Sequence, residues 1–206
     1  MNFDLPLFDA INSFALHTPW LHGPLLAYSS FGVVLLAAIL LGGWWHARTA
    51  SNPAAMAAAL WAPIGVLVAV GINQPIVSAV NEARPYATLP HIVVLATRSA
   101  DPSFPSDHAV MAGAVIAGTF LVTRGWLAWT AVIAGGLLAF SRVYIAAHYP
   151  HDVLAGLILG AAVSLLGYLL LRSPLTAAVR GLERGRLRPL LTAAPPVPAP
   201  PRATRS

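Results

Sequence analysis

Apolar side chains form five long runs along the chain, and none of these runs contains a charged residue. The runs are Pro24–Trp45, Pro53–Ile72, Ala109–Thr123, Gly125–Ser141 and Val153–Leu171. A helix of about 20 apolar residues crosses a bilayer, so three runs are long enough as they stand. The other two reach that length only with polar neighbours, which are Ser106, Asp107, His108 and Arg142. The pattern predicts five transmembrane helices, with polar groups at the ends of two of them.

The composition argues against a soluble domain. Hydrophobic residues make up 57% of the 206 residues and charged residues 9%, whereas about a quarter of the residues of a globular domain are charged. The remaining polar residues are too few to coat five buried core helices. We therefore predict an all-α, polytopic membrane helix bundle. The chain also lacks lysine and cysteine, which excludes lysine-dependent mechanisms, thiol nucleophiles, disulfides and cysteine-ligated metals.

The two ends of the chain differ from the helical core. Residues 1–23 have no basic start and carry Asp4 and Asp9 before their apolar positions, so they do not resemble a cleavable signal peptide. We interpret them as a helix lying at the outer interface, with a sixth, partial span as the alternative. The Pro/Ala-rich residues 189–206 are typical of a disordered cytoplasmic tail, which leaves residues 1–188 as the membrane domain.

Two glycines on the last run indicate how it packs. Gly156 and Gly160 are spaced G-x-x-x-G, which lets a neighbouring helix approach closely in a membrane. We interpret this pair as a packing feature.

Arginine is distributed unevenly between the two ends of the predicted helices. If the first run crosses from outside to inside, one side carries nine arginines and one acidic residue: Arg48, Arg124, Arg172, Arg180, Arg184, Arg186, Arg188, Arg202, Arg205 and Glu183. The other side carries three arginines and six acidic residues: Arg84, Arg98, Arg142, Asp4, Asp9, Glu82, Asp101, Asp107 and Asp152. Cytoplasmic loops are enriched in arginine and lysine. We therefore predict a cytoplasmic C-terminus.

Most of the remaining ionisable residues lie in three short segments at helix ends on the predicted outer side. The segments are Asn81–Tyr86, Pro102–His108 and Ser141–Asp152. Ionisable groups at or within a membrane are functional by default. Their shared side predicts that the three segments converge on one site.

The arginines of these segments indicate an anion-binding site. Arg84 and Arg142 supply planar, bidentate donors that match phosphate or carboxylate oxygens. Ser106 and Asp107 lie where a helix is predicted to begin, and the free N–H groups of a helix N-terminus favour phosphate. We therefore expect phosphate as the bound group.

The histidines indicate what happens to that phosphate. His148 and Asp152 are four residues apart, so the carboxylate can hold one ring nitrogen as N–H and leave the other free as a nucleophile. His108 is then available as the general acid for the departing oxygen. Together with the arginines, these residues predict phosphoryl transfer.

Other interpretations of single residues are simpler. We interpret His17, His46, His91 and His151 as surface histidines or as hydrogen-bonded core histidines. A zinc site is a second alternative, because His108, His148, His151 and Asp152 suffice in number. Neighbouring arginines would repel the cation, so we expect no metal.

The three segments resemble the signatures of the type 2 phosphatidic acid phosphatase (PAP2) superfamily of membrane phosphatases, K-x6-RP, PSGH and SR-x5-H-x3-D. The third signature matches at every fixed position, and the similarity runs from about Asn73 to Gly160. The resemblance implies a mechanism without metal or cofactor, in which His148 forms a phosphohistidine, Asp152 orients it and His108 protonates the departing oxygen. It assigns three residues to phosphate binding: Arg84, Arg142 and Ser106.

Two positions depart from the superfamily pattern. Val77 stands where the lysine is expected, and Asp107 replaces the glycine of PSGH. Both departures resemble the bacterial undecaprenyl-diphosphatase branch of the bacitracin-resistance type, with its E-x-RP, A-D-x-SFPSDH and FSR…HHYP-x-DVL segments. Ala147 replaces the first histidine of HHYP. Three accessory residues follow from these segments: Glu82, Asp107 and Ser141.

This branch implies an undecaprenyl-diphosphate phosphatase that recycles the peptidoglycan carrier lipid outside the bacterial cytoplasmic membrane. A diphosphate fits Asp107 and Glu82 only if both carboxylates face a proton, solvent or an arginine, and we expect Arg84 or Arg142 as the partner. We expect membrane lipids and a polyprenyl diphosphate as partners, and no nucleic acid. The alternatives are phosphatidylglycerophosphate, phosphatidate or diacylglycerol pyrophosphate as substrate, a non-catalytic phospholipid-binding protein, a transporter, or a haloperoxidase.

Overall fold

The computed structural model describes residues 4–195, and this part of the chain is helical without strands. The helices are α1 (Asp4–His17), α2 (Pro19–Ala50), α3 (Pro53–Val80), α4 (Pro85–Thr88), α5 (Asp107–Val122), α6 (Trp126–Tyr144), α7 (Pro150–Leu182) and α8 (Arg188–Leu191). All five predicted membrane helices are present, as α2, α3, α5, α6 and α7. The predicted all-α fold is confirmed.

Local signals explain where the long helices begin and end. α2, α3 and α7 each start with proline, whose fixed φ suits the first helical turn. The side chain of Asn52 caps α3 by accepting hydrogen bonds from the backbone N–H groups of Ala54 and Ala55, as expected for an N-cap. Asn81 ends α3 in the left-handed region with φ of 49°, which asparagine tolerates better than most residues.

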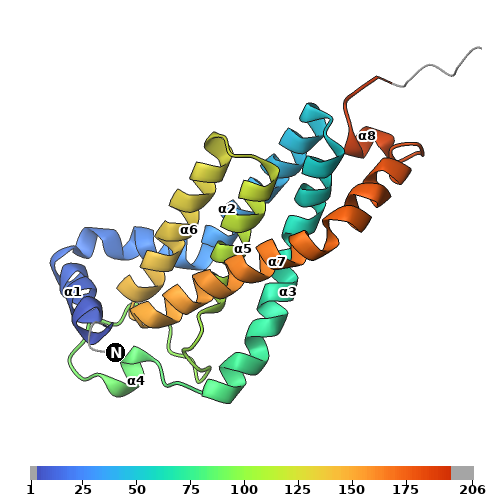
Figure 1. The fold of residues 1–206 in the computed structure, drawn as a ribbon. Coiled ribbons are helices and arrows are strands. Elements are labelled where there is room, and N and C mark those ends of the chain that lie inside the picture. Colours follow the sequence, from blue (N-terminus) through green and yellow to red (C-terminus); the bar gives the residue numbers. More distant parts are fainter. Residues whose placement is uncertain (1–3, 196–206) are drawn as a thin grey trace, which may run out of the picture.

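The bundle is built around α5, which packs against α3, α6 and α7 (Figure 1). α5 and α7 approach so closely that glycine is required at their contact. A Cβ atom on Gly160 would lie 2.0 Å from the carbonyl oxygen of Val110, and one on Gly113 would lie 2.1 Å from that of Leu157. The expected close approach at Gly160 is therefore confirmed, with α5 as the neighbouring helix.

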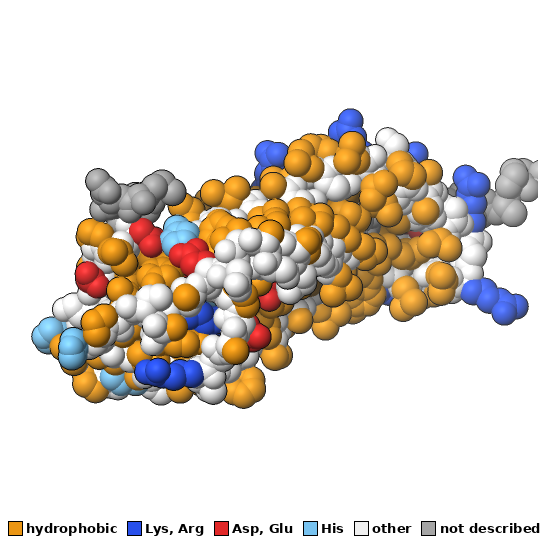
Figure 2. Space-filling model, turned by 90° about the horizontal axis from the view of Figure 1, so that it is seen from below, with side chains coloured by type: hydrophobic (Ala, Val, Ile, Leu, Met, Phe, Trp, Pro, Cys, Tyr) orange, Lys and Arg blue, Asp and Glu red, His pale blue; other side chains and the backbone are white. Residues whose placement is uncertain are grey.

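The outer surface of the bundle suits a bilayer. α2, α3, α6 and α7 are long and apolar enough to cross a membrane, and α5 is a shorter apolar helix. Large apolar side chains such as Leu67, Ile133 and Leu170 are exposed on it. Figure 2 shows hydrophobic side chains along the visible flank, with acidic and histidine side chains gathered toward one end. As predicted, the two shorter runs include polar neighbours, because α5 starts at Asp107 and α6 includes Arg142.

The N-terminal residues form a separate helix at the end of the bundle where α4 lies (Figure 1). It is shorter than predicted, because α1 ends at His17 and residues 19–23 belong to α2. Phe8 is fully buried, and the Asn12 side chain exchanges two hydrogen bonds with the backbone of Val93. α1 is therefore packed onto the protein, and its place at the membrane interface stays a prediction.

The predicted disordered tail begins with an ordered segment. α8 packs against α2, where Trp44 donates a hydrogen bond to the carbonyl oxygen of Leu190 and Arg48 donates one to that of Pro189. Leu191 is buried in the same contact. The described start of the tail is therefore helical and is held by two helix-end side chains of α2, while disorder of the tail stays a prediction. The rest of the tail, residues 196–206, lies outside the described residues.

Candidate active site

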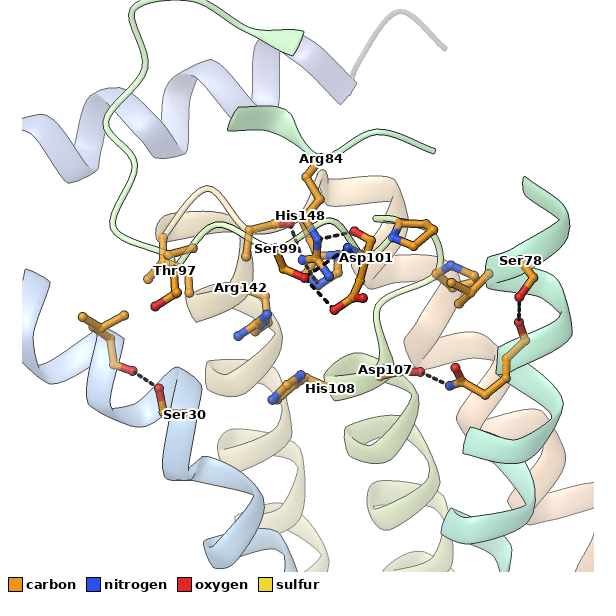
Figure 3. A pocket seen from close by; sticks show the side chains of 18 residues that line it. Ser30, Ser78, Arg84, Thr97, Ser99, Asp101, Asp107, His108, Arg142 and His148 are labelled. Atoms are coloured by element: carbon orange, nitrogen blue, oxygen red, sulfur yellow. Dashed lines mark hydrogen bonds between the residues drawn. The ribbon is translucent and has the colours of Figure 1, made fainter. Parts of the chain in front are cut away.

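The polar ends of the helices meet at one end of the bundle and surround a cavity of about 690 Å³. Five of the predicted site residues line it: Arg84, Asp107, His108, Arg142 and His148. Figure 3 shows Arg84, His108, Arg142 and His148 pointing toward the same space from different elements. The three segments therefore converge as the sequence predicts.

The contacts of His148 define which of its ring nitrogens is free to react. The side chain is buried in the loop between α6 and α7. Its Nδ1 lies 2.8 Å from the carbonyl oxygen of Ser103, and its Nε2 lies 3.2 Å from Nη1 of Arg84. Because a carbonyl only accepts and a guanidinium only donates hydrogen bonds, the proton is on Nδ1 and the lone pair is on Nε2. Nε2 is therefore the ring atom that carries the lone pair on the side of Arg84.

Asp152 lies behind the ring of His148, on the first turn of α7. Its Oδ2 accepts hydrogen bonds from the backbone N–H of Tyr149 at 2.8 Å and from the hydroxyl of Ser103. The same oxygen lies 3.4 Å from Nδ1 of His148. The sequence predicts that Asp152 holds the Nδ1 proton, but the carbonyl of Ser103 is the closer acceptor. Asp152 therefore lies beside the ring without being the nearest acceptor of the Nδ1 proton.

Burial determines the protonation of His148. Removal from water lowers the pKa of His148, and the neighbouring cations Arg142 and Arg84 lower it further, while the contact with Asp152 raises it. Desolvation is the largest of these effects, since a buried charge is costly. Burial therefore favours the neutral imidazole.

Both cavity arginines are held by fixed acceptors. Arg84 donates from Nε to the carbonyl oxygen of Asp101 at 2.8 Å and from Nη1 to that of Ala147 at 3.0 Å. Arg142 donates from Nη1 to the hydroxyl of Ser29 on α2 at 2.7 Å. These contacts fix the guanidinium groups at the cavity wall and leave further N–H groups for an anion.

The expected arginine partners of the two accessory carboxylates are wrong. Asp107 accepts hydrogen bonds from the amides of Asn73 at 2.7 Å and Gln74 at 3.0 Å, both on α3. Glu82 contacts Nε2 of His151 at 3.0 Å. Neutral amides hold the charge of Asp107 in place without removing a cation from the cavity.

Two predicted serines lie outside the cavity lining. Ser106 is fully buried at the start of α5, and its hydroxyl has no hydrogen-bond partner among the described residues. Ser141 is also buried, and its hydroxyl donates to the carbonyl oxygen of Leu138 within α6. The Ser141 hydroxyl therefore bonds within its own helix, while Ser106 lies next to the cavity residues Asp107 and His108.

Four residues of this region were not predicted as part of the phosphate site: Ser29, Ser103, Asp4 and His151, the last of which the sequence offered only for zinc. Ser103 belongs to the second segment, so its position was a usable signal. Ser29 and Asp4 lie 113 and 147 residues from the groups that they contact. No local pattern marks such pairs.

One group of residues has the composition of a metal site. Ligand atoms of Glu82, His151 and Asp152 lie within 4.8 Å of one another. These atoms contact each other as a histidine between carboxylates, with Nε2 of His151 3.0 Å from Oε2 of Glu82 and 3.1 Å from Oδ1 of Asp152. His108 and His148, which the sequence also offered for zinc, are not in this group.

Comparisons with known proteins agree with the site. Residues 58–173 match the PAP2 superfamily. The chain is 32% identical over 167 residues to the undecaprenyl-diphosphatase BcrC of Bacillus subtilis, covering 81% of this chain and 82% of the relative. It is also 32% identical over 168 residues to the putative undecaprenyl-diphosphatase YbjG of Escherichia coli, covering 77% and 78%.

A crystal structure shares the fold. It is the first transmembrane PAP2-type phosphatidylglycerolphosphate phosphatase of Bacillus subtilis, with a TM-score of 0.58, 20% identity and coverage of 88% of this chain and 89% of that one. The fold, the converging segments and the sequence match point the same way. The chain therefore belongs to the PAP2 superfamily and is a PAP2-type phosphatase of the membrane.

Proposed function

We propose that the chain removes the terminal phosphate of undecaprenyl diphosphate and releases undecaprenyl phosphate and inorganic phosphate. One observation carries the proposal: the unprotonated Nε2 of His148 faces a cavity that also holds Arg84, Arg142 and His108. The names of the relatives, both at 32% identity, support the diphosphate of a polyprenyl lipid as the substrate class.

The proposed reaction proceeds in two steps at one phosphorus atom. Nε2 of His148 attacks the terminal phosphorus, the P–N bond forms, and the P–O bond to the lipid phosphate breaks as His108 protonates the departing oxygen. Water then attacks the phosphohistidine, and His108 accepts its proton as the P–N bond breaks. Inorganic phosphate leaves and His148 is restored. The Nδ1 proton stays on the ring throughout, held by the carbonyl of Ser103.

The two arginines supply the binding charge. Their remaining N–H groups can hold the equatorial oxygens of the reacting phosphate, where negative charge accumulates. A diphosphate presents more anionic oxygen than a monophosphate ester, so these two cations suffice without the lysine that Val77 replaces. Its leaving group is also a phosphate rather than an alkoxide, which reduces the demand on His108 as an acid.

The cavity also offers a place for the start of the lipid tail. Leu26 of α2 and Val77 of α3 contribute apolar lining on the side of these two helices. Apolar contact at this point favours a hydrocarbon chain next to the phosphates.

The test is phosphate release by the purified protein in detergent, with and without EDTA. Undecaprenyl diphosphate, phosphatidate and phosphatidylglycerophosphate are compared. We expect strong preference for undecaprenyl diphosphate and no effect of EDTA. The double variant Asp107→Gly, Val77→Lys should gain activity toward monophosphates. If phosphatidate is hydrolysed equally well by the wild type, the proposed substrate is wrong while a PAP2 phosphatase remains.

We also propose that the active-site end faces outside, since arginine gathers at the opposite end. Ala87 in α4 and Gly185 after α7 are both exposed, and the chain lacks cysteine. In intact cells an impermeant thiol reagent should label Ala87→Cys and not Gly185→Cys. The reverse labelling pattern would invert the orientation.

A further inference from the structure

The N-terminal helix contacts the active-site region through the carboxylate of Asp4, in addition to the packing of Phe8 against the ring of Tyr149. Asp4, at the start of α1, is largely buried. Its Oδ1 accepts a hydrogen bond from the backbone N–H of His151 at 2.9 Å, and its Oδ2 lies 2.8 Å from Nδ1 of the same residue. Because an ionised carboxylate only accepts hydrogen bonds, Nδ1 carries a proton. Asp4 therefore fixes both the backbone and the ring of His151.

The other nitrogen of His151 faces two more carboxylates. Nε2 lies 3.0 Å from Oε2 of Glu82 and 3.1 Å from Oδ1 of Asp152. When these carboxylates are ionised, both contacts require a proton on Nε2, so the ring donates from both nitrogens and is a cation. The ring also stacks on two aromatic rings, with ring centroids 5.5 Å apart for Phe104 and 5.6 Å apart for Tyr149. Three carboxylates and two aromatic rings therefore fix its orientation.

Asp152 depends on this cation at one of its two oxygens. Oδ2 has the hydrogen bonds from Tyr149 and Ser103. Oδ1 is buried, and among the described residues it has no well-aligned hydrogen-bond donor, so the His151 ring beside it is its charge partner. A buried carboxylate with one oxygen left unpaired is costly. Without His151, this oxygen would lose its charge partner, and the carboxylate would turn.

We propose that α1 completes the active site, with His151 acting as a positioning residue. Asp4 fixes His151, His151 fixes the carboxylate of Asp152, and Asp152 in turn lies against the ring of His148. The inference rests on the proposed function, because it concerns the same nucleophile. It deepens that function by adding two residues: Asp4, which lies outside the three polar segments, and His151, which occupies an unspecified position of SR-x5-H-x3-D in the third segment. The helix at the N-terminus is then a catalytic support rather than a membrane anchor alone.

The test uses three single variants and one double variant of the full-length protein. His151→Phe keeps a ring between Phe104 and Tyr149 but removes both nitrogens, and Asp4→Asn removes the charge with little change of shape. Asp9→Asn, on the exposed side of α1, is the matched control. kcat and KM are measured in detergent for the substrate that the wild type hydrolyses fastest in the panel above. Thermal unfolding reports whether each variant is folded.

We expect His151→Phe to lower kcat by about 10-fold to 100-fold, the loss typical of a hydrogen bond to a charged group, with KM unchanged. Asp4→Asn should lower kcat less, and in the His151→Phe background it should cost nothing further, because both act through one ring. Asp9→Asn should match the wild type. The proposal is overturned if Asp4→Asn and His151→Phe both keep the wild-type kcat, or if their losses of kcat add up in the double variant. It is also overturned if a rise in KM alone accounts for the loss of kcat/KM. If His151→Phe does not fold, Asp4→Asn alone decides.

A second measurement separates this inference from the proposed substrate. The ¹⁵N NMR signals of the His148 ring are recorded in detergent without substrate. His151→Phe should shift them, because the carboxylate beside Nδ1 moves, and Asp9→Asn should not. If no lipid in the panel is hydrolysed, the proposed function fails and these signals decide the inference: a shift supports it and unchanged signals overturn it.

Discussion

The Asp152→Asn variant tests which group holds the proton of the nucleophile. In a serine protease triad, the corresponding change leaves the histidine in the wrong tautomer and costs about 10⁴-fold in kcat. Here the carbonyl of Ser103, at 2.8 Å, holds Nδ1–H of His148. The backbone N–H of Tyr149 and the hydroxyl of Ser103 would also keep the asparagine carbonyl at the position of Oδ2. The reactive tautomer should therefore survive.

What the variant loses is the negative charge next to the ring. For unit charges 3.4 Å apart, the Coulomb energy is about 5 kcal/mol at an effective dielectric constant of about 20. With about half of the positive charge developed on the ring in the transition state, the loss is about 2.5 kcal/mol, which corresponds to about 60-fold in kcat. The expected loss is thus well below that of a triad.

The assay is steady-state phosphate release, combined with trapping of the phosphoenzyme by rapid acid-free quenching. Asp152→Asn should form phosphoenzyme about 60-fold more slowly than the wild type, and the KM should stay unchanged. Asp9→Asn serves as the control for charge removal far from His148. A loss of about 10⁴-fold or more would show that Asp152 and not Ser103 sets the tautomer, and an unchanged rate would show that the charge is unused.

Three further predictions follow from the site and the helix contacts. His108→Ala should still form a phosphoenzyme from a substrate with a good leaving group, detected by ³²P labelling, whereas His148→Ala should form none. Because burial lowers the pKa of His148, the nucleophile stays neutral as the pH falls, so the loss of kcat/KM that reports its protonation should lie below about pH 6.5; a midpoint above that value contradicts this. Gly160→Ala should lower the Tm strongly, because its Cβ would meet the carbonyl of Val110, while Gly136→Ala, with no atom within 4 Å, should not.

The features that could be predicted from the sequence are those that depend on residues close together in the chain. Apolar runs of spanning length set the helices, and the glycine at position 160 marked the contact between α5 and α7. The three polar segments each end or begin a helix, so a common side of the membrane brings His108, Arg142 and His148 to one cavity.

The unpredicted features depend on packing or on backbone atoms. Arg142 binds Ser29 because α2 lies against α6, and His151 binds Asp4 because α1 lies across the start of α7. Neither serine nor aspartate at those positions stands out in the sequence. The role of the Ser103 carbonyl could not be read from a side chain at all, since every residue has one.

The length of the short helix α5 determines how deep the proposed phosphate site lies relative to the membrane surface. At 1.5 Å per residue, its 16 residues span about 24 Å, less than the hydrocarbon thickness of about 30 Å. α3 continues for seven residues beyond Asn73, which binds Asp107 at the start of α5, and so rises about 10 Å above that level. The proposed phosphate site is therefore recessed below the end of α3, and we expect that a lipid presents its headgroup there without leaving its leaflet. A thicker bilayer would submerge the ends of α5 and α6, so turnover in vesicles should fall as the lipid acyl chains are lengthened.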